Sequence, residues 1–132
     1  MIFGVGTDIA KVSRFEKWVR NPDMIRRFFN ACEIPGEGRE AVSERQIHFL
    51  CEHYAARFAA KEAFAKALGT GFVGLELSDF GITKDDNGKP SFLFGEKTLS
   101  QIEKICGKGW KVSVSISHEK EYAVSFVVIE LA

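Results

Sequence analysis

The 132-residue sequence contains no apolar run close to the roughly 20 residues that a membrane-spanning helix needs. Its first residues, Met1 to Gly6, lack the basic segment and the cleavage site of a secretory signal. The three cysteines are scattered and never form a Cys-x-x-Cys pair, which argues against a disulfide framework and a zinc site. The formal net charge is zero, so no overall field would recruit nucleic acid. These absences predict a protein of the reducing cytoplasm that binds neither membrane nor nucleic acid.

Apolar and charged residues are both abundant. They make up 45% and 27% of the chain, which is typical of a globular protein, and the length suits one compact domain over residues 1–132. The twelve phenylalanines are expected mainly in its core. Residues 11–27 carry six basic residues against two acidic ones. This segment is either a solvated surface or a docking patch for an acidic partner.

The first half of the sequence is mostly helical in pattern. Residues 2–7 are β-branched and apolar, which predicts a strand, and residues 11–20 have helical spacing. Asp23 is positioned to cap a second short helix that runs through Phe29. Ser43 and Gln46 resemble a capping box, which predicts a long helix from there to Leu68, ended by Gly69.

The second half is mostly strand in pattern. Residues 77–83 and 90–94 are predicted strands, and Asn87-Gly88 between them favours a type I′ hairpin turn. Residues 96–106 have helical spacing, and the segments 111–117 and 122–131 are two longer strands joined by a tight turn. Early helices followed by late strands predict an α+β fold with an antiparallel sheet beside the long helix.

Glu62 is the most informative residue of the long helix because it falls on the apolar side. That side runs through Leu50, Tyr54, Phe58, Ala65 and Leu68. A carboxylate on the packed side of a helix is costly unless it is paired or binds a metal. Lys66, four residues on, would make an ordinary ion pair, but the alanines around Glu62 leave room for another group to approach closely. Arg57, Lys61 and Lys66 add cations that suit phosphate.

Asp8 provides a second carboxylate, after the first predicted strand. It is either the N-cap of the following helix or a partner of Glu62. Two carboxylates from separate segments, completed by water and phosphate oxygens, suit Mg²⁺. His118 lies at the predicted tip of the last hairpin, where it is either a surface residue or part of a site. His48 and His53 have no evident partners in the sequence and are interpreted as structural.

Several segments of the chain resemble one known family in order. They are Gly6-Thr7-Asp8-Ile9, the run from Arg57 to Gly71, Asn87-Gly88-Lys89-Pro90, Ser115-Ile116-Ser117-His118 and, more weakly, Phe29 to Glu33. The sequence resembles the holo-(acyl-carrier-protein) synthases, the small trimeric class of 4′-phosphopantetheinyl transferases. The run from Arg57 to Gly71 is the most specific of these matches. Residues 34–46 depart from the family pattern, so no nucleotide contacts are assigned there.

This resemblance implies transfer of the 4′-phosphopantetheine group from coenzyme A to a serine of apo-acyl carrier protein, for fatty acid biosynthesis. It implies that Asp8 and Glu62 bind Mg²⁺ and that Lys66 lies near the phosphates of coenzyme A. Arg57, Asn87 and His118 match positions of the nucleotide site, and His118 or a group activated by the carboxylates would take up the serine proton. The family also implies a homotrimer with coenzyme A at subunit boundaries. The acidic carrier would dock on Lys11, Arg14 and Lys17.

Two other functions are compatible with the residues alone. A magnesium-dependent hydrolase of nucleotide pyrophosphates would use the same carboxylates and lysine. A module that binds carrier protein or nucleotide without catalysis has little use for Asp8, Glu62 and Lys66 together. The specificity of the central motif disfavours the hydrolase, and the presence of both carboxylates and Lys66 disfavours the binding module.

Overall fold

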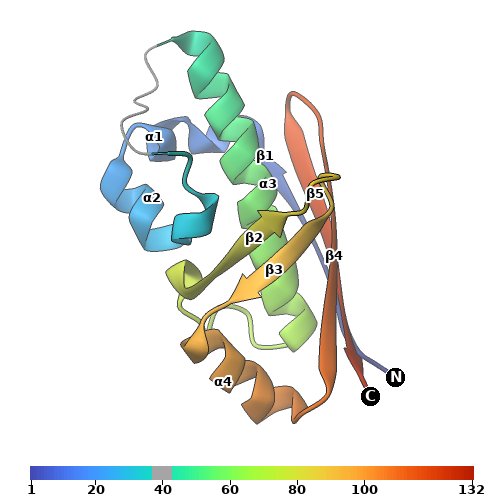
Figure 1. The fold of residues 1–132 in the computed structure, drawn as a ribbon. Helices are drawn as coiled ribbons and strands as arrows, with labels where there is room; N and C mark the ends of the chain where they lie inside the picture. Colours follow the sequence, from blue (N-terminus) through green and yellow to red (C-terminus); the bar gives the residue numbers. More distant parts are fainter. Residues whose placement is uncertain (37–42) are drawn as a thin grey trace.

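The computed structural model describes residues 1–36 and 43–132. Its central element is the helix α3 (Glu44–Leu68), which runs through the middle of the molecule between the long strands and a smaller hairpin (Figure 1). The predicted capping box is confirmed: Ser43 accepts a hydrogen bond from the Gln46 amide, and the Gln46 side chain accepts one from the Ser43 amide. Gly69 ends the helix in the left-handed conformation, at φ 86°.

The long strands form an antiparallel three-stranded sheet in the order β1-β5-β4. Its members are β1 (Ile2–Lys11), β4 (Trp110–His118) and β5 (Tyr122–Leu131). β1 is longer than the predicted strand 2–7 because its pairing with β5 continues to Lys11, which lies opposite Tyr122. Asp8 is therefore an interior residue of this strand, and the interpretation of Asp8 as a helix cap is wrong. The α+β fold with a long helix against an antiparallel sheet is confirmed.

The predicted helix over residues 11–20 is confirmed only in part. Lys11 still belongs to β1, and the chain then forms a 3-10 turn, η1 (Val12–Phe15), and one α-helical turn, α1 (Glu16–Val19). The next helix, α2 (Pro22–Phe28), is capped by Asn21, whose side chain accepts a hydrogen bond from the Met24 amide. The prediction of Asp23 as the cap is thus also wrong, because Asp23 lies in the first turn and pairs with Arg26. A short turn, η2 (Ala31–Glu33), follows α2.

A second, two-stranded sheet is formed by β2 (Phe80–Lys84) and β3 (Pro90–Phe94). The first three residues of the predicted strand 77–83 instead form the 3-10 turn η3 (Leu77–Asp79). Gly88 has a φ of 81°, but Asn87 does not have a positive φ, so the predicted type I′ turn is wrong. The turn closes when the Gly88 amide donates to the Asp85 carbonyl, at 2.9 Å, which makes the left-handed Gly88 the last of the four turn residues. The helix α4 (Glu96–Cys106) follows as predicted.

Glycines let β1 approach α3 closely. A Cβ atom on Gly6 would lie 1.8 Å from the carbonyl oxygen of Ala63, and one on Gly4 would lie 1.9 Å from that of Ala67. Since alternate residues of a strand share a face, Asp8 continues the helix-facing row of Gly4 and Gly6. The small residues of the central motif thus make room for β1.

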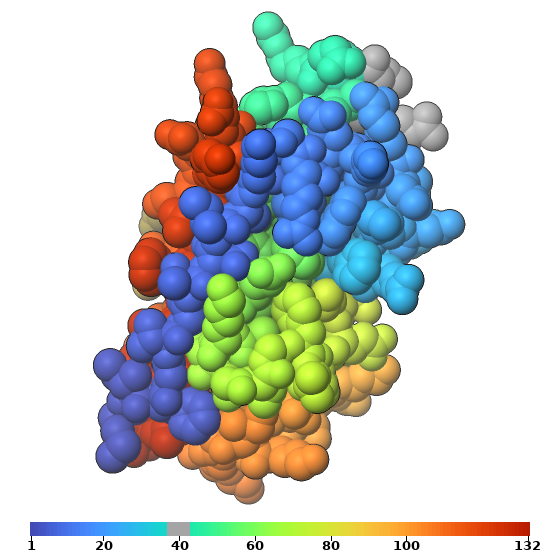
Figure 2. Space-filling model, turned by 180° about the vertical axis from the view of Figure 1, so that it is seen from behind, coloured from blue at the N-terminus to red at the C-terminus, as the bar shows by residue number. Residues whose placement is uncertain are grey.

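The other face of the sheet is largely uncovered. Side chains that alternate with this row remain exposed, including Val5 and Ile9 of β1 and Phe126 of β5, which are 57%, 64% and 53% exposed. Seen from behind, β1 lies along the surface of the molecule beside the end of α3 (Figure 2). Among the described residues, no helix is both long and apolar enough to cross a membrane.

Candidate functional site

The two predicted metal ligands meet between β1 and α3. Asp8 points from the helix-facing side of β1, with a side chain only 12% exposed, and Glu62 lies in α3. Burial raises the pKa of Glu62, and a hydrogen bond with Asp8 and the negative charge of Asp8 raise it further. The charges of Arg14 and Lys66 oppose this rise in pKa. The structure thus forces two carboxyl groups together in a partly buried place.

Lys66 belongs to the same cluster. Its ammonium lies 3.2 Å from Asp8 Oδ1 and donates a hydrogen bond to the Thr7 carbonyl at 2.9 Å. Its ion pair is therefore with Asp8 across the two elements, not the expected pair with Glu62 one turn away along the helix. The Lys66 side chain is 55% exposed, so its charge also faces solvent.

The chemistry of this donor set fits Mg²⁺. A hard cation that keeps several water and phosphate ligands needs only one or two carboxylates from the protein. A divalent ion between Asp8 and Glu62 would also relieve the repulsion that raises the pKa of Glu62. The described residues contain no group of three or more His, Cys, Asp or Glu side chains placed to hold a metal. The pair is therefore suited to an ion that a substrate helps to coordinate, and not to an all-protein metal site.

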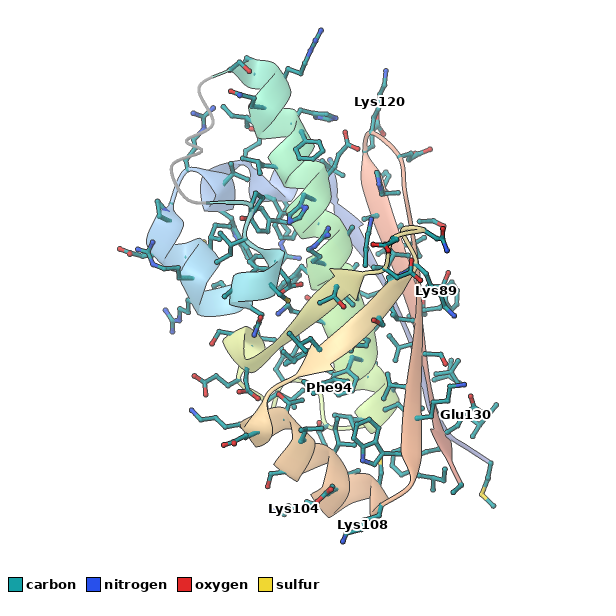
Figure 3. All side chains as sticks on the ribbon, viewed as in Figure 1. Lys89, Phe94, Lys104, Lys108, Lys120 and Glu130 are labelled. Atoms are coloured by element: carbon teal, nitrogen blue, oxygen red, sulfur yellow. The ribbon has the colours of Figure 1, made fainter. Side chains whose placement is uncertain are left out.

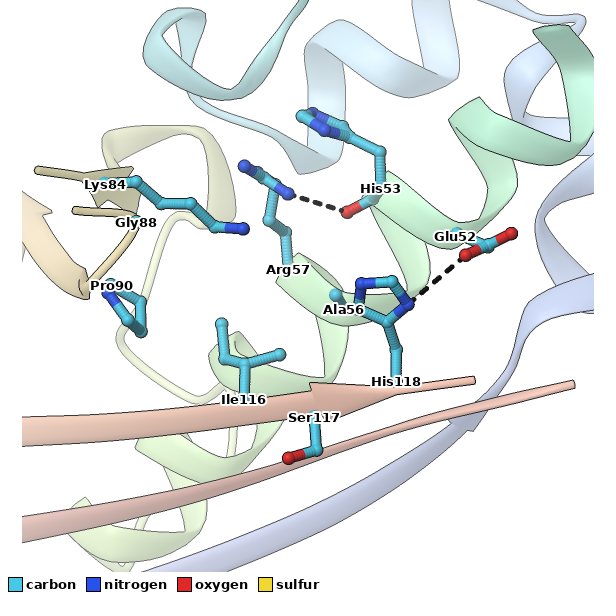
Figure 4. Close-up of a pocket in the computed structure, with 10 residues that line it drawn as sticks. All are labelled: Glu52, His53, Ala56, Arg57, Lys84, Gly88, Pro90, Ile116, Ser117 and His118. Atoms are coloured by element: carbon cyan, nitrogen blue, oxygen red, sulfur yellow. Dashed lines mark hydrogen bonds and ion pairs between the residues drawn. The ribbon is translucent and has the colours of Figure 1, made fainter. Parts of the chain in front are cut away.

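A pocket of about 320 Å³ lies on another side of α3 (Figure 4). Its walls come from α3, from the β2–β3 hairpin and from the end of β4. It is lined by Glu52, His53, Ala56, Arg57, Lys84, Gly88, Pro90, Ile116, Ser117 and His118. Figure 3 shows Lys89 at the turn of the β2–β3 hairpin and Lys120 at the tip of the β4–β5 hairpin.

Of the residues predicted for the nucleotide site, Arg57 and His118 line this pocket. Asn87 is in the adjoining turn, next to Gly88, and remains a prediction. Arg57 Nη1 donates to the His53 carbonyl at 3.2 Å, whereas its buried Nε has no hydrogen-bond partner in the described part of the chain. Burial lowers the pKa of Arg57, and the charge of Glu33 opposes this. An incompletely paired guanidinium at a pocket wall suits an anionic ligand.

Sequence reasoning missed the partners of three residues near the pocket. His53, interpreted as structural, donates a hydrogen bond to the Glu33 carbonyl, and burial together with the charge of Arg57 lowers its pKa to about 4. His48 was interpreted in the same way but pairs with Glu52, the residue that also pairs with His118. The spacing of His48 and Glu52, four residues apart on one helix, was the available signal.

Lys61 does not act as a phosphate-seeking cation. Its side chain is fully buried, and its ammonium lies 2.7 Å from Glu33 Oε1. The same ammonium donates to the carbonyls of Leu77, at 2.6 Å, and Phe80. Lys61 thus holds η2 and the start of β2 against α3.

The predicted docking residues are all exposed, although they do not share a helix. Lys11 ends β1, Arg14 is in η1 and Lys17 is in α1. The Arg14 guanidinium lies over the rings of Phe58, Phe15 and Trp18, at 5.3, 5.7 and 5.7 Å from their centroids. Arg14 therefore extends toward α3 and influences Glu62, while Lys11 and Lys17 face solvent.

The family follows from comparison with known proteins. A model of the 4′-phosphopantetheinyl transferase superfamily matches residues 4–127. The chain is 42% identical over 131 residues to a holo-[acyl-carrier-protein] synthase of Treponema denticola, with 98% of this chain and 99% of that protein covered. The chain therefore belongs to the 4′-phosphopantetheinyl transferase superfamily. Within it, the full-length match confirms the resemblance to the holo-(acyl-carrier-protein) synthases.

Solved structures agree with this assignment. The fold matches the crystal structure of a holo-[acyl-carrier-protein] synthase from Neisseria meningitidis with a TM-score of 0.77 at 33% identity, over 98% of this chain and 99% of that one. It also matches a holo-(acyl-carrier-protein) synthase of Bacillus anthracis strain Ames, described as a complex with CoA (3′,5′-ADP). That match has a TM-score of 0.74 at 32% identity and covers 100% of this chain and 99% of the other.

Proposed function

We propose that this protein is a holo-acyl-carrier-protein synthase, which transfers 4′-phosphopantetheine from coenzyme A to a serine of apo-acyl carrier protein. The bond between phosphorus and the leaving 3′,5′-ADP breaks as the serine oxygen bonds to that phosphorus, and the serine proton is released. The observation that carries this proposal is the carboxylate pair, Asp8 and Glu62, beside the ammonium of Lys66. This set occurs in a chain whose full-length relatives are named for this reaction.

Asp8, Glu62 and Lys66 would have different roles, which their positions support. Asp8 and Glu62 would hold Mg²⁺, which, when bound, supplies charge neutralisation at the pyrophosphate of coenzyme A. Lys66, half exposed beside Asp8, would bind the phosphate that leaves. Most of the acceleration would then come from positioning and charge stabilisation, as in other phosphoryl transfers.

The nucleotide end of coenzyme A is assigned to the pocket lined by Arg57 and His118, with Asn87 in the adjoining turn. Arg57 would bind an anionic group there, because its Nε has no partner among the described residues. Lys84, which the sequence did not single out, extends the positive charge at the same wall. None of the residues lining this pocket belongs to the Asp8–Glu62–Lys66 cluster.

A trimer accounts for this separation. If coenzyme A lies at a boundary between subunits, the pocket of one chain and the carboxylates of a neighbour complete one site. The exposed apolar side chains of the sheet, including Ile9 and Phe126, provide a surface that a second chain would bury. We also propose that the acidic carrier docks on Lys11, Arg14 and Lys17, and that one domain, residues 1–132, acts in the cytoplasm.

The test is intact-mass spectrometry of apo-acyl carrier protein after incubation with this protein, coenzyme A and Mg²⁺. A gain of one phosphopantetheine group, lost with EDTA, is the expected result. Glu62→Gln should abolish the gain, while Glu103→Gln, an exposed glutamate of α4, serves as the matched control. Cleavage of coenzyme A without modified carrier would replace the proposal by a hydrolase. An unmodified carrier with intact, bound coenzyme A would replace it by a binding module.

A further inference from the structure

The ammonium of Lys66 lies against two oxygen atoms of β1. It donates a hydrogen bond to the Thr7 carbonyl at 2.9 Å and another to Asp8 Oδ1 at 3.2 Å. The Asp8 side chain is 12% exposed and the Lys66 side chain is 55% exposed, so the carboxylate is shielded while the lysine is open to solvent. Lys66 is therefore a counter-ion of Asp8 that can move away without unpacking the core.

A divalent cation and this ammonium are alternative partners of the Asp8 carboxylate. Both bind through the lone pairs of its oxygens. A cation bound to Asp8 would lie close to the ammonium of Lys66, and their like charges would repel each other more strongly than in bulk water because the carboxylate is shielded. Binding of the cation therefore favours movement of Lys66 away from Asp8.

A second cation, Arg14, acts on the same cluster but is held differently. Its charge, like that of Lys66, acts on Glu62. Its guanidinium lies over three aromatic rings, and in the described part of the chain the ion pair of Asp8 is with Lys66 and not with Arg14. Arg14 thus provides a positive charge of fixed position. Lys66, on a flexible four-carbon stem, can reach either Asp8 or a phosphate.

We infer that Lys66 is an exchangeable counter-ion, whose ammonium competes with the divalent cation for Asp8 and is drawn away by the phosphates of the nucleotide. The nucleotide then makes Asp8 available to the cation. Each of the two ligands tightens binding of the other, because linkage between two sites is reciprocal. The part played by the nucleotide rests on the proposed function, whereas the competition between Lys66 and the cation does not.

Binding of Mn²⁺ without nucleotide tests the competition. Mn²⁺ suits the same oxygen ligands, and electron paramagnetic resonance measures the concentration of the free ion. Lys66→Met should lower the Kd of Mn²⁺ about two- to fivefold, the factor that an exposed ion pair is worth. Arg14→Met removes an equal charge that is not paired with Asp8 and should lower the Kd less. An equal effect of the two substitutions, or a Kd that does not fall in Lys66→Met, overturns the inference.

NMR of wild-type protein labelled with ¹⁵N at the lysine side chains follows the movement of Lys66 itself. Lys66→Met assigns the signal of the Lys66 ammonium. Titration with Mg²⁺ should shift this signal, or broaden it beyond detection, in step with saturation of the site. The signal of Lys120, at the tip of the β4–β5 hairpin, should stay unchanged. A Lys66 signal that saturating Mg²⁺ leaves unaffected overturns the inference.

Coenzyme A tests the part played by the nucleotide. At saturation it should tighten Mn²⁺ binding to wild type, and the factor should be about two- to fivefold smaller in Lys66→Met, where no ammonium has to leave Asp8. The tightening that remains comes from phosphate oxygens that coordinate the cation directly. Equal factors in the two proteins would overturn the inference. If coenzyme A does not bind while Lys66→Met still tightens Mn²⁺ binding, the proposed function fails and the competition between Lys66 and the cation stands.

Discussion

Replacing Lys61 by methionine tests whether the buried ion pair with Glu33 holds the two halves of the fold together. Methionine keeps most of the length of lysine but removes the ammonium. Glu33 is then left fully buried, and its donors within residues 1–36 and 43–132 are the amides of Asn30 and Ile82, at 3.0 and 3.2 Å. The carbonyls of Leu77 and Phe80 also lose their donor.

The expected cost follows from this geometry. Breaking a buried ion pair by removing one partner costs about 3–5 kcal/mol, because an uncompensated charge remains inside. That is a large part of the roughly 5–15 kcal/mol by which domains are stable. The double variant Lys61→Met/Glu33→Gln should be more stable than Lys61→Met alone, because no unpaired charge is left. Lys66→Met, the same change at a lysine of the same helix whose side chain is 55% exposed, should cost less than Lys61→Met.

Urea unfolding followed by circular dichroism, at one fixed protein concentration, measures these differences. The slope of the transition should stay constant, so that shifts in midpoint report stability. A Lys61→Met variant within about 1 kcal/mol of wild type would refute the reasoning. The same conclusion would follow if Lys61→Met and Lys66→Met were destabilised equally.

Four further predictions concern other parts of the molecule. Gly6→Ala should destabilise the fold by about 1–3 kcal/mol and impair transfer, because the added methyl group would overlap the Ala63 carbonyl and force β1 away from α3. A variant with wild-type unfolding and activity would contradict this prediction. Phe126→Glu should dissociate the proposed trimer in sedimentation velocity experiments, and an unchanged sedimentation coefficient would place the interface elsewhere. Lys17→Glu should raise the apparent KM for carrier protein and leave the KM for coenzyme A unchanged, and the rise should be smaller in high salt. If the variant and wild type have the same KM for carrier protein at low salt, Lys17 is not part of the docking surface. His53 has a pKa of about 4 in the folded protein, below its ordinary 6.5, so the unfolded chain binds more protons between these values and the free energy of unfolding falls as the pH drops from 6.5 toward 4. His53→Gln should reduce this dependence of the unfolding free energy on pH. Equal dependence in the variant and in wild type would contradict the prediction.

Local signals in the sequence predicted the elements whose ends depend on nearby residues. Ser43, Gln46 and Gly69 bound α3 because capping bonds form within one turn of the helix. The start of the helix predicted over residues 11–20 was misplaced because Lys11 pairs with β5, a strand more than a hundred residues away in the chain. The turn at Asn87-Gly88 was predicted in the right place but with the wrong type, because Gly88 takes the left-handed conformation and Asn87 does not.

In the candidate site too, features that depend on nearby residues were predicted and contacts between distant segments were not. Asp8 and Glu62 were linked by their residue types and by the family resemblance, and the structure brings them together. Lys61 was misjudged because nothing within a few residues of it shows that Glu33, from another segment, would neutralise it. The link from Glu52 to His118 was not predictable either, because it joins a helix to a strand across the tertiary structure.

The contact of β1 with α3 has a consequence for how the protein can change over evolution. Gly4 and Gly6 lie against main-chain carbonyl oxygens of the helix, and main-chain atoms do not alter when core side chains are exchanged. The distance between the Asp8 and Glu62 side chains is therefore set by a main-chain contact, which does not depend on the identity of nearby core side chains. Substitutions in the aromatic clusters can accumulate and shift thermal stability while the spacing of Asp8 and Glu62 stays constant. Only the two glycines are fixed by this requirement.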